Sequence, residues 1–287
     1  ASDVYKRQPA DNWRWTLGLG AIPAAVFAVG MILSPQSPRW LIRDNQVEKA
    51  RRVLKRVRIT DDEIESEITD IQDSLKSQEA GLRELFGTFR PVMILLFVLT
   101  FFQVFTGINA AVYYAPEIFH NLGMANASIL ADFAVGGALV VSTFLSLPFI
   151  DRLGRKKLLE ISLGGQVPPA IALCIWSDNA TIAIVAIFVY VFAFGFGLGP
   201  VFWSYVPEIL PLKARALGMG VITFTQYLFN GILSLIFPML LEALGINVFY
   251  IFAALSALAV FYIHKNVLET KGRTLEDIEH YWETKQV

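Results

Sequence analysis

The feature that most constrains this chain of 287 residues is a series of long apolar runs. A helix needs about 20 apolar residues to cross roughly 30 Å of hydrocarbon. Runs near this length lie at about residues 15–33, 91–119, 129–150, 158–176, 182–206, 216–240 and 248–264. Because the runs are continuous and do not alternate, they favour helices over the strands of a membrane β-barrel. The sequence therefore predicts an all-α integral membrane protein with about seven transmembrane helices.

The composition supports this class and argues against several others. Of the residues, 55% are hydrophobic and only 17% are charged, and the formal net charge is −1. A nucleic-acid partner would need a basic face, so none is expected. The three histidines are far apart and Cys174 is the one cysteine. No nucleophile–base pair, metal-ligand spacing or phosphate loop is present, so we expect no enzyme activity, cofactor or metal.

Positive charges alternate between the loops. Lys and Arg gather in residues 39–83, 152–157 and 213–215 and in the C-terminal tail, whereas 120–128, 177–181 and 242–247 contain none. Cytoplasmic loops carry an excess of Lys and Arg. The pattern predicts a multi-pass protein of the cell membrane with the basic loops and the C-terminus in the cytoplasm.

A polar segment separates the first two apolar runs. Residues 46–58 are basic and helical in composition, and residues 61–77 carry Ile64, Ile68, Ile71 and Leu75 at helical spacing. This spacing favours short amphipathic helices beneath the membrane. A solvated linker is the alternative.

The second apolar run carries polar groups that lipid does not tolerate without partners. Gln103, Asn109 and Tyr113 lie within it, with Gly107 between the two amides. In an ideal helix the two amides would point about 120° apart, but Gly107 can break the helix and turn both toward one cavity. Polar side chains at a broken helix indicate a cavity that holds a polar molecule.

Several motifs occur in order along the chain, each at the end of an apolar run. They read P-R-W-L at 38–41, D-R-L-G-R-K-K at 151–157, P-E-I-L-P at 207–211 and E-T-K-G-R-T-L at 269–275. Together with Gln103, Gly107 and Asn109, they strongly resemble the sugar porter family of the major facilitator superfamily. The resemblance extends from about residue 13 to residue 281.

The resemblance implies a fold and a division of the chain. The family has twelve membrane helices in two halves, so we expect a partial major facilitator fold that lacks the N-terminal half. Residues 9–34 would be the sixth helix, 35–88 a cytoplasmic helical linker, 89–268 the C-terminal six-helix half and 269–287 a cytoplasmic helix. Residues 1–8 match nothing that follows, and we expect them to be a remnant of assembly.

The resemblance also implies a sugar-binding site. Gln103, Asn109 and Gln226 match positions whose amides bond sugar hydroxyls, and Trp203 matches a tryptophan that packs on the sugar ring, with Phe194 on the same wall. Amides suit this task because each offers donors and an acceptor without a charge. Hydrogen bonding between helices is the alternative for the amides, and plain packing for Trp203. Asn230, one turn beyond Gln226, faces either the substrate or a neighbouring helix.

Two gates are implied as well. Tyr113 and Tyr114 would close an outer gate over bound sugar, unless they are only interfacial residues. Asp151, Arg152, Arg155, Glu208 and Arg215 resemble a cytoplasmic ion-pair network that latches one conformation. Anchoring by positive charge is the alternative for the basic residues, but an acid at the end of an apolar run needs a partner.

Two amide positions of the family pattern hold apolar residues, and a third position also differs. Val104 and Leu139 stand where sugar porters carry an amide, and Tyr227 stands in place of a tryptophan. The cavity is therefore less polar than a typical hexose site, which favours a smaller or less hydroxylated substrate such as a pentose or a polyol, or a divergent transporter of reduced affinity. We expect alternating-access transport of a monosaccharide (hexose or pentose) or a polyol. Proton symport is favoured because Gln226 followed by an aromatic residue resembles the bacterial proton-coupled members of the family. A facilitative uniporter and a non-transporting sugar sensor are the alternatives.

Overall fold

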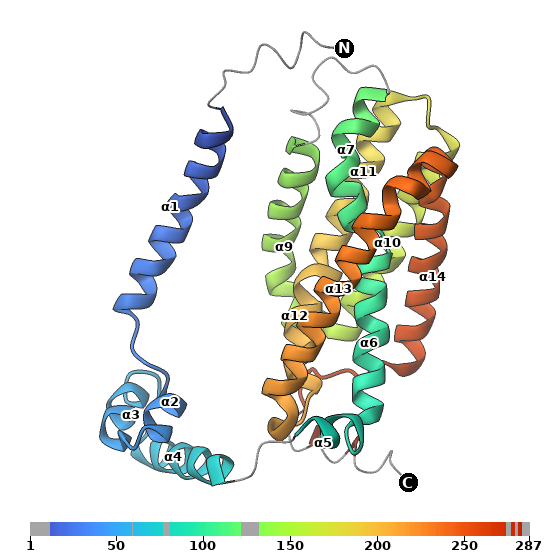
Figure 1. Ribbon diagram of the computed structural model, residues 1–287. Helices are drawn as coiled ribbons and strands as arrows, with labels where there is room; N and C mark the ends of the chain where they lie inside the picture. Colours follow the sequence, from blue (N-terminus) through green and yellow to red (C-terminus); the bar gives the residue numbers. More distant parts are fainter. Residues whose placement is uncertain are drawn as a thin grey trace. The chain divides into compact units, whose positions relative to one another are not determined.

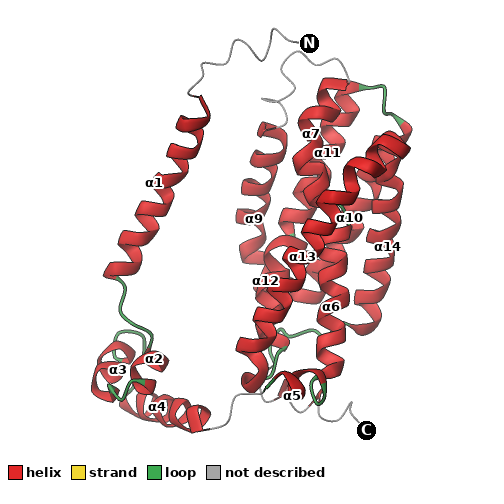
Figure 2. Ribbon diagram, in the orientation of Figure 1, coloured by secondary structure: helices red, strands yellow, loops and turns green. Residues whose placement is uncertain are grey.

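The structure is a computed structural model and describes residues 12–58, 60–76, 81–121, 132–273, 277–278 and 281–282. Within these, the side chains of residues 12–17, 19–20, 73–76, 113–114, 117–121, 132–134 and 212 lie outside the description. All regular structure in the described residues is helical (Figures 1 and 2). The chain divides into two compact units, residues 1–78 and 79–287.

The first unit begins with α1 (Asn12–Leu33), an apolar helix whose described side chains are all exposed. Phe27, for example, is 70% exposed. An uncovered apolar helix needs lipid or another apolar helix around it. It fits the membrane span predicted at residues 15–33.

Three short helices complete the first unit: α2 (Pro38–Arg43), α3 (Val47–Leu54) and α4 (Asp61–Lys76). Pro38 occupies the first helical position of α2, and the Ser37 hydroxyl accepts the N–H of Trp40, a standard helix start. The helices share a small core of Leu41, Ile42, Ala50, Leu54, Ile64 and Ile68. The apolar side of α4 is thus used for packing among these helices, which a solvated linker would not show.

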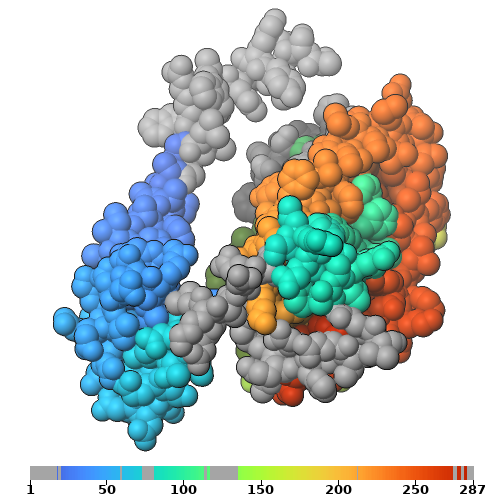
Figure 3. Space-filling model, turned by 60° about the horizontal axis from the view of Figure 1, so that its bottom comes forward, coloured from blue at the N-terminus to red at the C-terminus, as the bar shows by residue number. Residues whose placement is uncertain are grey.

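The second unit is a bundle of long helices. Its elements are α5 (Leu82–Phe86), α6 (Arg90–Phe105), α7 (Ile108–Asn121), the π-helical turn η2 (Asp132–Gly137), α9 (Ala138–Leu153), α10 (Arg155–Ile175), α11 (Ala180–Phe196), α12 (Leu198–Ile209), α13 (Leu212–Leu244), the 3₁₀ turn η3 (Gly245–Asn247) and α14 (Val248–Asn266). The short helix α5 lies on the surface against the start of α13 (Figure 3).

Five continuous segments of the described chain are long and apolar enough to cross a membrane. They are Arg90–Val112, Val135–Leu153, Arg155–Ile175, Ala180–Ile209 and Lys213–Asn266. The last one holds two helices, because the turn at Gly245–Asn247 reverses the chain and α13 and α14 run in opposite directions (Figure 1). With α1, the segments account for the seven apolar runs and confirm an all-α membrane protein.

Two of these spans are interrupted helices. The first breaks between α6 and α7 at Gly107, whose φ of 87° is a left-handed value. A β-carbon there would also collide with the ring of Phe252 on α14, so both the backbone and the close approach require glycine. The second break separates α11 from α12 at Gly197, where a β-carbon would collide with Ser162 on α10.

The polar groups freed at the breaks have partners inside the bundle. Ser162 spans the second break, because its hydroxyl donates to the carbonyl of Ala193 at 2.7 Å and accepts the N–H of Leu198 at 2.9 Å. At the first break, the hydroxyl of the fully buried Tyr190 donates to the carbonyl of Thr106. Backbone that leaves the helical pattern at membrane depth is stable only with such partners.

Candidate functional site

Two amide side chains meet beside the break between α6 and α7, and the backbone of a third amide residue takes part. Asn109, in the first turn of α7, donates a hydrogen bond from Nδ2 to Oδ1 of Asn230 on α13. Asn230 in turn donates from Nδ2 to the backbone carbonyl of Gln226, one turn earlier, at 3.0 Å. The structure therefore joins two of the predicted site residues, Asn109 and Gln226, through Asn230, and shows that Asn230 does contact a neighbouring helix.

Two amide oxygens of the predicted site are buried without a partner. Gln103 on α6 is only 5% exposed, and neither its Oε1 nor the Oε1 of Gln226 has a hydrogen-bond partner among the described residues. A buried acceptor left unpaired costs about 1–3 kcal/mol. Both oxygens would gain from a ligand or water that donates to them.

The predicted aromatic wall is divided between exposed and packed positions. Trp203 on α12 is 38% exposed, and its indole packs edge-on against the buried ring of Phe202, with centroids 5.2 Å apart. Tyr227, the residue next to Gln226, is 70% exposed. Phe194 is half-buried near the end of α11, where it packs against both apolar cores of the bundle. Trp203 is thus available to a ligand, while Phe194 also has a packing role.

Val104 and Leu139, the apolar residues at amide positions of the family pattern, lie in apolar surroundings. Val104 is fully buried in the core formed mainly by α7, α10, α11 and α14. Leu139, near the start of α9, packs against the same core. The predicted outer-gate residues Tyr113 and Tyr114 lie within α7, but their side chains are outside the described residues.

A second polar group forms at the opposite end of the bundle from η3, where α9 turns into α10. Arg155, the first residue of α10, bonds Asp151 at 3.2 Å from Nη1 and Glu208 at 2.9 Å from Nη2 and 3.2 Å from Nε. The other Glu208 oxygen accepts the Thr270 hydroxyl at 2.6 Å. We call Asp151, Arg155, Glu208, Glu269 and Thr270 the charged cluster.

Glu269 and Thr270 are members of the charged cluster that were not predicted as site residues, and Glu269 makes the larger number of bonds. Its carboxylate accepts the backbone N–H of Arg155 at 2.9 Å, Lys156 at 3.1 Å and Lys271 at 3.0 Å. The first two lie at the N-terminus of α10, where free N–H groups and the helix dipole favour an anion. The signal was present in the sequence, because Glu269 begins the motif at residues 269–275.

The remaining predicted members make other contacts. The Arg152 carbonyl accepts the Lys271 ammonium at 2.7 Å, and the Arg215 guanidinium donates to the Leu210 carbonyl at 3.4 Å. The charged cluster, without Glu269, lines a hollow of about 330 Å³ together with Lys271, Gly272, Arg273 and Ile278. These contacts tie the segment after α14 to the ends of α9, α10 and α12.

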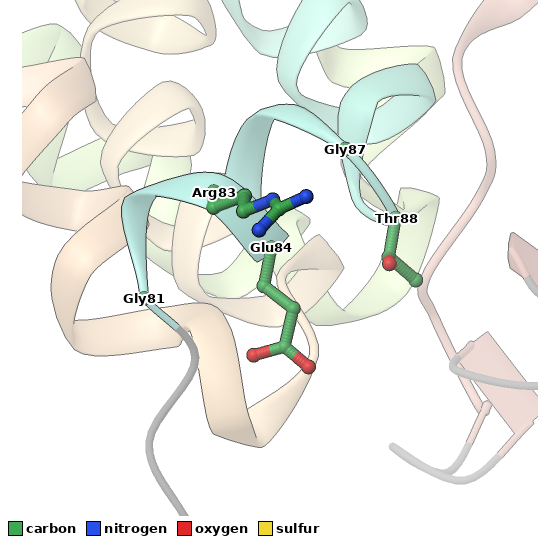
Figure 4. Close-up of a pocket in the computed structure, with 5 residues that line it drawn as sticks. All are labelled: Gly81, Arg83, Glu84, Gly87 and Thr88. Atoms are coloured by element: carbon green, nitrogen blue, oxygen red, sulfur yellow. The ribbon is translucent and has the colours of Figure 1, made fainter.

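A second hollow, of about 480 Å³, lies at α5. It is lined by Gly81, Arg83, Glu84, Gly87 and Thr88, with the Arg83 and Glu84 side chains both projecting from the short helix (Figure 4). None of the predicted site residues lines it. In the part of the chain that the structure describes, no group of three or more His, Cys, Asp or Glu is arranged to hold a metal ion.

Comparison with known proteins gives the family. The sequence matches the family described as "Sugar (and other) transporter" over residues 2–282. It is 40% identical to YwtG of Bacillus subtilis, a protein named for metabolite transport, over 94% of this chain and 61% of that protein. It is 36% identical to a D-xylose transporter of Levilactobacillus brevis, over 93% of this chain and 61% of the relative.

The fold agrees. A structure of the proton:xylose symporter XylE of the major facilitator superfamily, bound to 6-bromo-6-deoxy-D-glucose, superposes with a TM-score of 0.81 at 30% identity. The superposition covers 98% of this chain and 62% of XylE, so the chain spans less than two thirds of the length of these relatives. The chain belongs to the sugar transporter family of the major facilitator superfamily.

Proposed function

We propose that this chain is the C-terminal part of a secondary transporter that carries a monosaccharide or polyol across the cell membrane by alternating access, coupled to protons. The observation that carries the proposal is the group of amides at the α6–α7 break, with Asn109 joined to Asn230 and Gln226. Two relatives named for xylose, one of them a proton symporter, support the substrate class and the coupling.

The described residues suit a small polyhydroxyl ligand. The unpartnered oxygens of Gln103 and Gln226 would accept hydrogen bonds from sugar hydroxyls, and this removes the cost of their burial. The exposed face of Trp203 offers an apolar surface to the C–H face of a sugar ring. Val104 and Leu139 add no polar groups, so a pentose or a polyol fits as well as a hexose.

The exposed apolar surfaces require surroundings that neither unit supplies by itself. α1 is uncovered within its unit, and Tyr227 and Trp203 are exposed in theirs. We propose that an N-terminal half of the same transporter and the lipid bilayer cover these surfaces, and that the substrate binds between the two halves. The basic loops would then face the cytoplasm.

The charged cluster would act as a cytoplasmic latch. Its bonds hold α9, α10, α12 and the segment after α14 together in one arrangement. Ion pairs that form in only one conformation bias the balance between conformations. Tyr113 and Tyr114 are our candidates for the outer gate. We propose no enzymatic reaction for the chain, because it belongs to a family of transporters.

Uptake into proteoliposomes tests the proposal. The full-length protein that contains this chain should take up D-xylose, D-glucose or a polyol such as xylitol, faster when the outside is acidic. Gln103→Ala and Trp203→Ala should each weaken binding at least about tenfold, or ~1.4 kcal/mol. Uptake at a rate that does not depend on the proton gradient would indicate a uniporter, and binding without uptake would indicate a sensor. Unchanged binding in both variants would refute the site.

The chain by itself provides a second test. If the substrate binds between two halves, proteoliposomes that contain only residues 1–287 should take up no sugar. Matched proteoliposomes with the full-length protein are the control. Robust uptake by the chain alone would overturn the proposed need for an N-terminal half.

A further inference from the structure

The hydrogen bonds among Asn109, Asn230 and Gln226 run in one direction. This series of hydrogen bonds starts at the backbone carbonyl of Gln226, which accepts a hydrogen bond from Nδ2 of Asn230 at 3.0 Å. The other end of the Asn230 amide, Oδ1, accepts Nδ2 of Asn109. Both Asn109 and Asn230 are half-buried, so each side chain also has an unburied part.

The carbonyl fixes the orientation of both amides. A backbone carbonyl only accepts hydrogen bonds, whereas a side-chain amide has one end that accepts and one that donates. Asn230 must therefore turn its NH₂ toward Gln226 and its oxygen toward α7. Asn109 must then turn its NH₂ toward Asn230, because two facing oxygens would repel. Neither amide is free to flip without losing a hydrogen bond.

This orientation leaves Oδ1 of Asn109 on the side of the amide that faces away from Asn230. Asn109 is only half-buried, which leaves part of the residue open to another molecule. Its Oδ1 offers lone pairs and no hydrogen. A ligand group that meets it must be a hydrogen-bond donor.

We propose that Asn230 is a positioning residue, which holds Asn109 so that its carbonyl oxygen faces the substrate and selects a hydroxyl that donates. This inference rests on the proposed function and deepens it. Asn230 uses its own oxygen and one N–H within the protein, so it acts on the substrate through Asn109. The alternative is that Asn230 contacts the sugar directly.

A double-mutant cycle separates these roles. The dissociation constant of D-xylose is measured for the full-length protein with Asn109→Ala, Asn230→Ala and both. We expect Asn109→Ala to weaken binding about tenfold, Asn230→Ala about three- to tenfold, and the double variant no more than Asn109→Ala alone, since residues that act through one contact are not additive. A double variant whose loss equals the product of the two single losses would overturn the inference.

Asn266→Ala is the matched control. Its Nδ2 donates to the carbonyl of Tyr262, four residues earlier, at 3.0 Å, the same bond that Asn230 makes to Gln226. Asn266 lies at the end of α14, outside the amide group. Its loss should leave the dissociation constant within about twofold of the unmutated value, well below the loss expected at Asn230.

A ligand series tests the same inference without any substitution. At each hydroxyl of D-xylose, a deoxy and a deoxyfluoro analogue are compared, because fluorine can accept weakly but cannot donate. At the hydroxyl that contacts Asn109, both analogues should bind about tenfold more weakly than D-xylose. This difference in affinity should disappear in the Asn109→Ala variant. A deoxyfluoro analogue that keeps its affinity at every hydroxyl sensitive to Asn109 would overturn the inference.

The outcomes also separate this inference from the function on which it rests. If the unmutated protein binds none of the sugars tested, the proposed function fails and the inference fails with it. If it binds sugar and Asn109→Ala reduces the affinity, but the cycle is additive, only the role of Asn230 is wrong.

Discussion

Replacement of Gly154, which lies between α9 and α10, should disturb the charged cluster without removing any of its side chains. The Gly154 φ of 87° and ψ of 166° lie in a region that is essentially restricted to glycine. A β-carbon at this position would sit 2.5 Å from Oε2 and 2.9 Å from Oε1 of Glu269. Gly154→Ala therefore strains the backbone and displaces the carboxylate that caps α10.

The size of the effect follows from these two parts. The backbone strain costs about 1–3 kcal/mol. The displaced carboxylate loses its bonds to the N–H groups of Arg155 and Lys156, and each bond to a charged group is worth about 1.5 kcal/mol at this half-buried site. We expect a total near 5 kcal/mol, which corresponds to a fall of about 10–20 °C in Tm, at ~2–4 °C per kcal/mol.

The assay is thermal unfolding of the full-length protein in detergent, at one fixed scan rate because unfolding of large proteins is often irreversible. Gly164→Ala is the matched control, since Gly164 lies within α10 and a β-carbon there meets no atom within 4 Å. It should leave Tm unchanged or raise it slightly, because alanine favours a helix more than glycine does.

A cycle with Glu269→Ala checks the physical reason. Without the carboxylate, Gly154→Ala should cost only the strain, about 2 kcal/mol, so the two changes should couple by roughly 3 kcal/mol, the contribution of the two bonds. A Tm for Gly154→Ala within 1–2 °C of the Gly164→Ala control would refute the reasoning. Additive effects would show that the close approach of Glu269 does not matter.

Two further predictions concern bonds that join separate helices. Ser162→Ala should lower the free energy of unfolding by about 1–3 kcal/mol, because it leaves the buried N–H of Leu198 unpaired. We expect faster hydrogen exchange in residues 197–201, and unchanged exchange would contradict the prediction. Glu208→Gln should remove the ion pair with Arg155 while its remaining oxygen can still accept the Thr270 hydroxyl. The rate of hydrogen exchange in residues 267–273 should rise in both variants, but severalfold less in Glu208→Gln than in Glu208→Ala. Equal rates in the two variants would contradict the bond between Glu208 and Thr270.

The sequence determined the class of the fold because transmembrane helices are local features. Each apolar run is long enough to cross the bilayer, and its length and continuity need no knowledge of neighbours. The break at Gly107 was predicted on the same local grounds, from a glycine between two amides. The helices predicted at residues 46–58 and 61–77 followed from composition and apolar spacing. The structure adds α2 and the core, including Leu54 and Ile64, that the short helices share.

The site needed the tertiary structure because its residues are distant in sequence. The amide of Asn230 was predicted to face either the substrate or a neighbouring helix, and only the packing of α7 against α13 brings it to Asn109, 121 positions away. Glu269 was visible as part of a motif, but its role depends on the approach of the segment after α14 to the first turn of α10. Periodicity reports which residues share a helix face, whereas partners across helices depend on how the helices pack. The sequence alone therefore determined the membrane-spanning class and the candidate residues, and the tertiary structure decided which of them are bonded to one another.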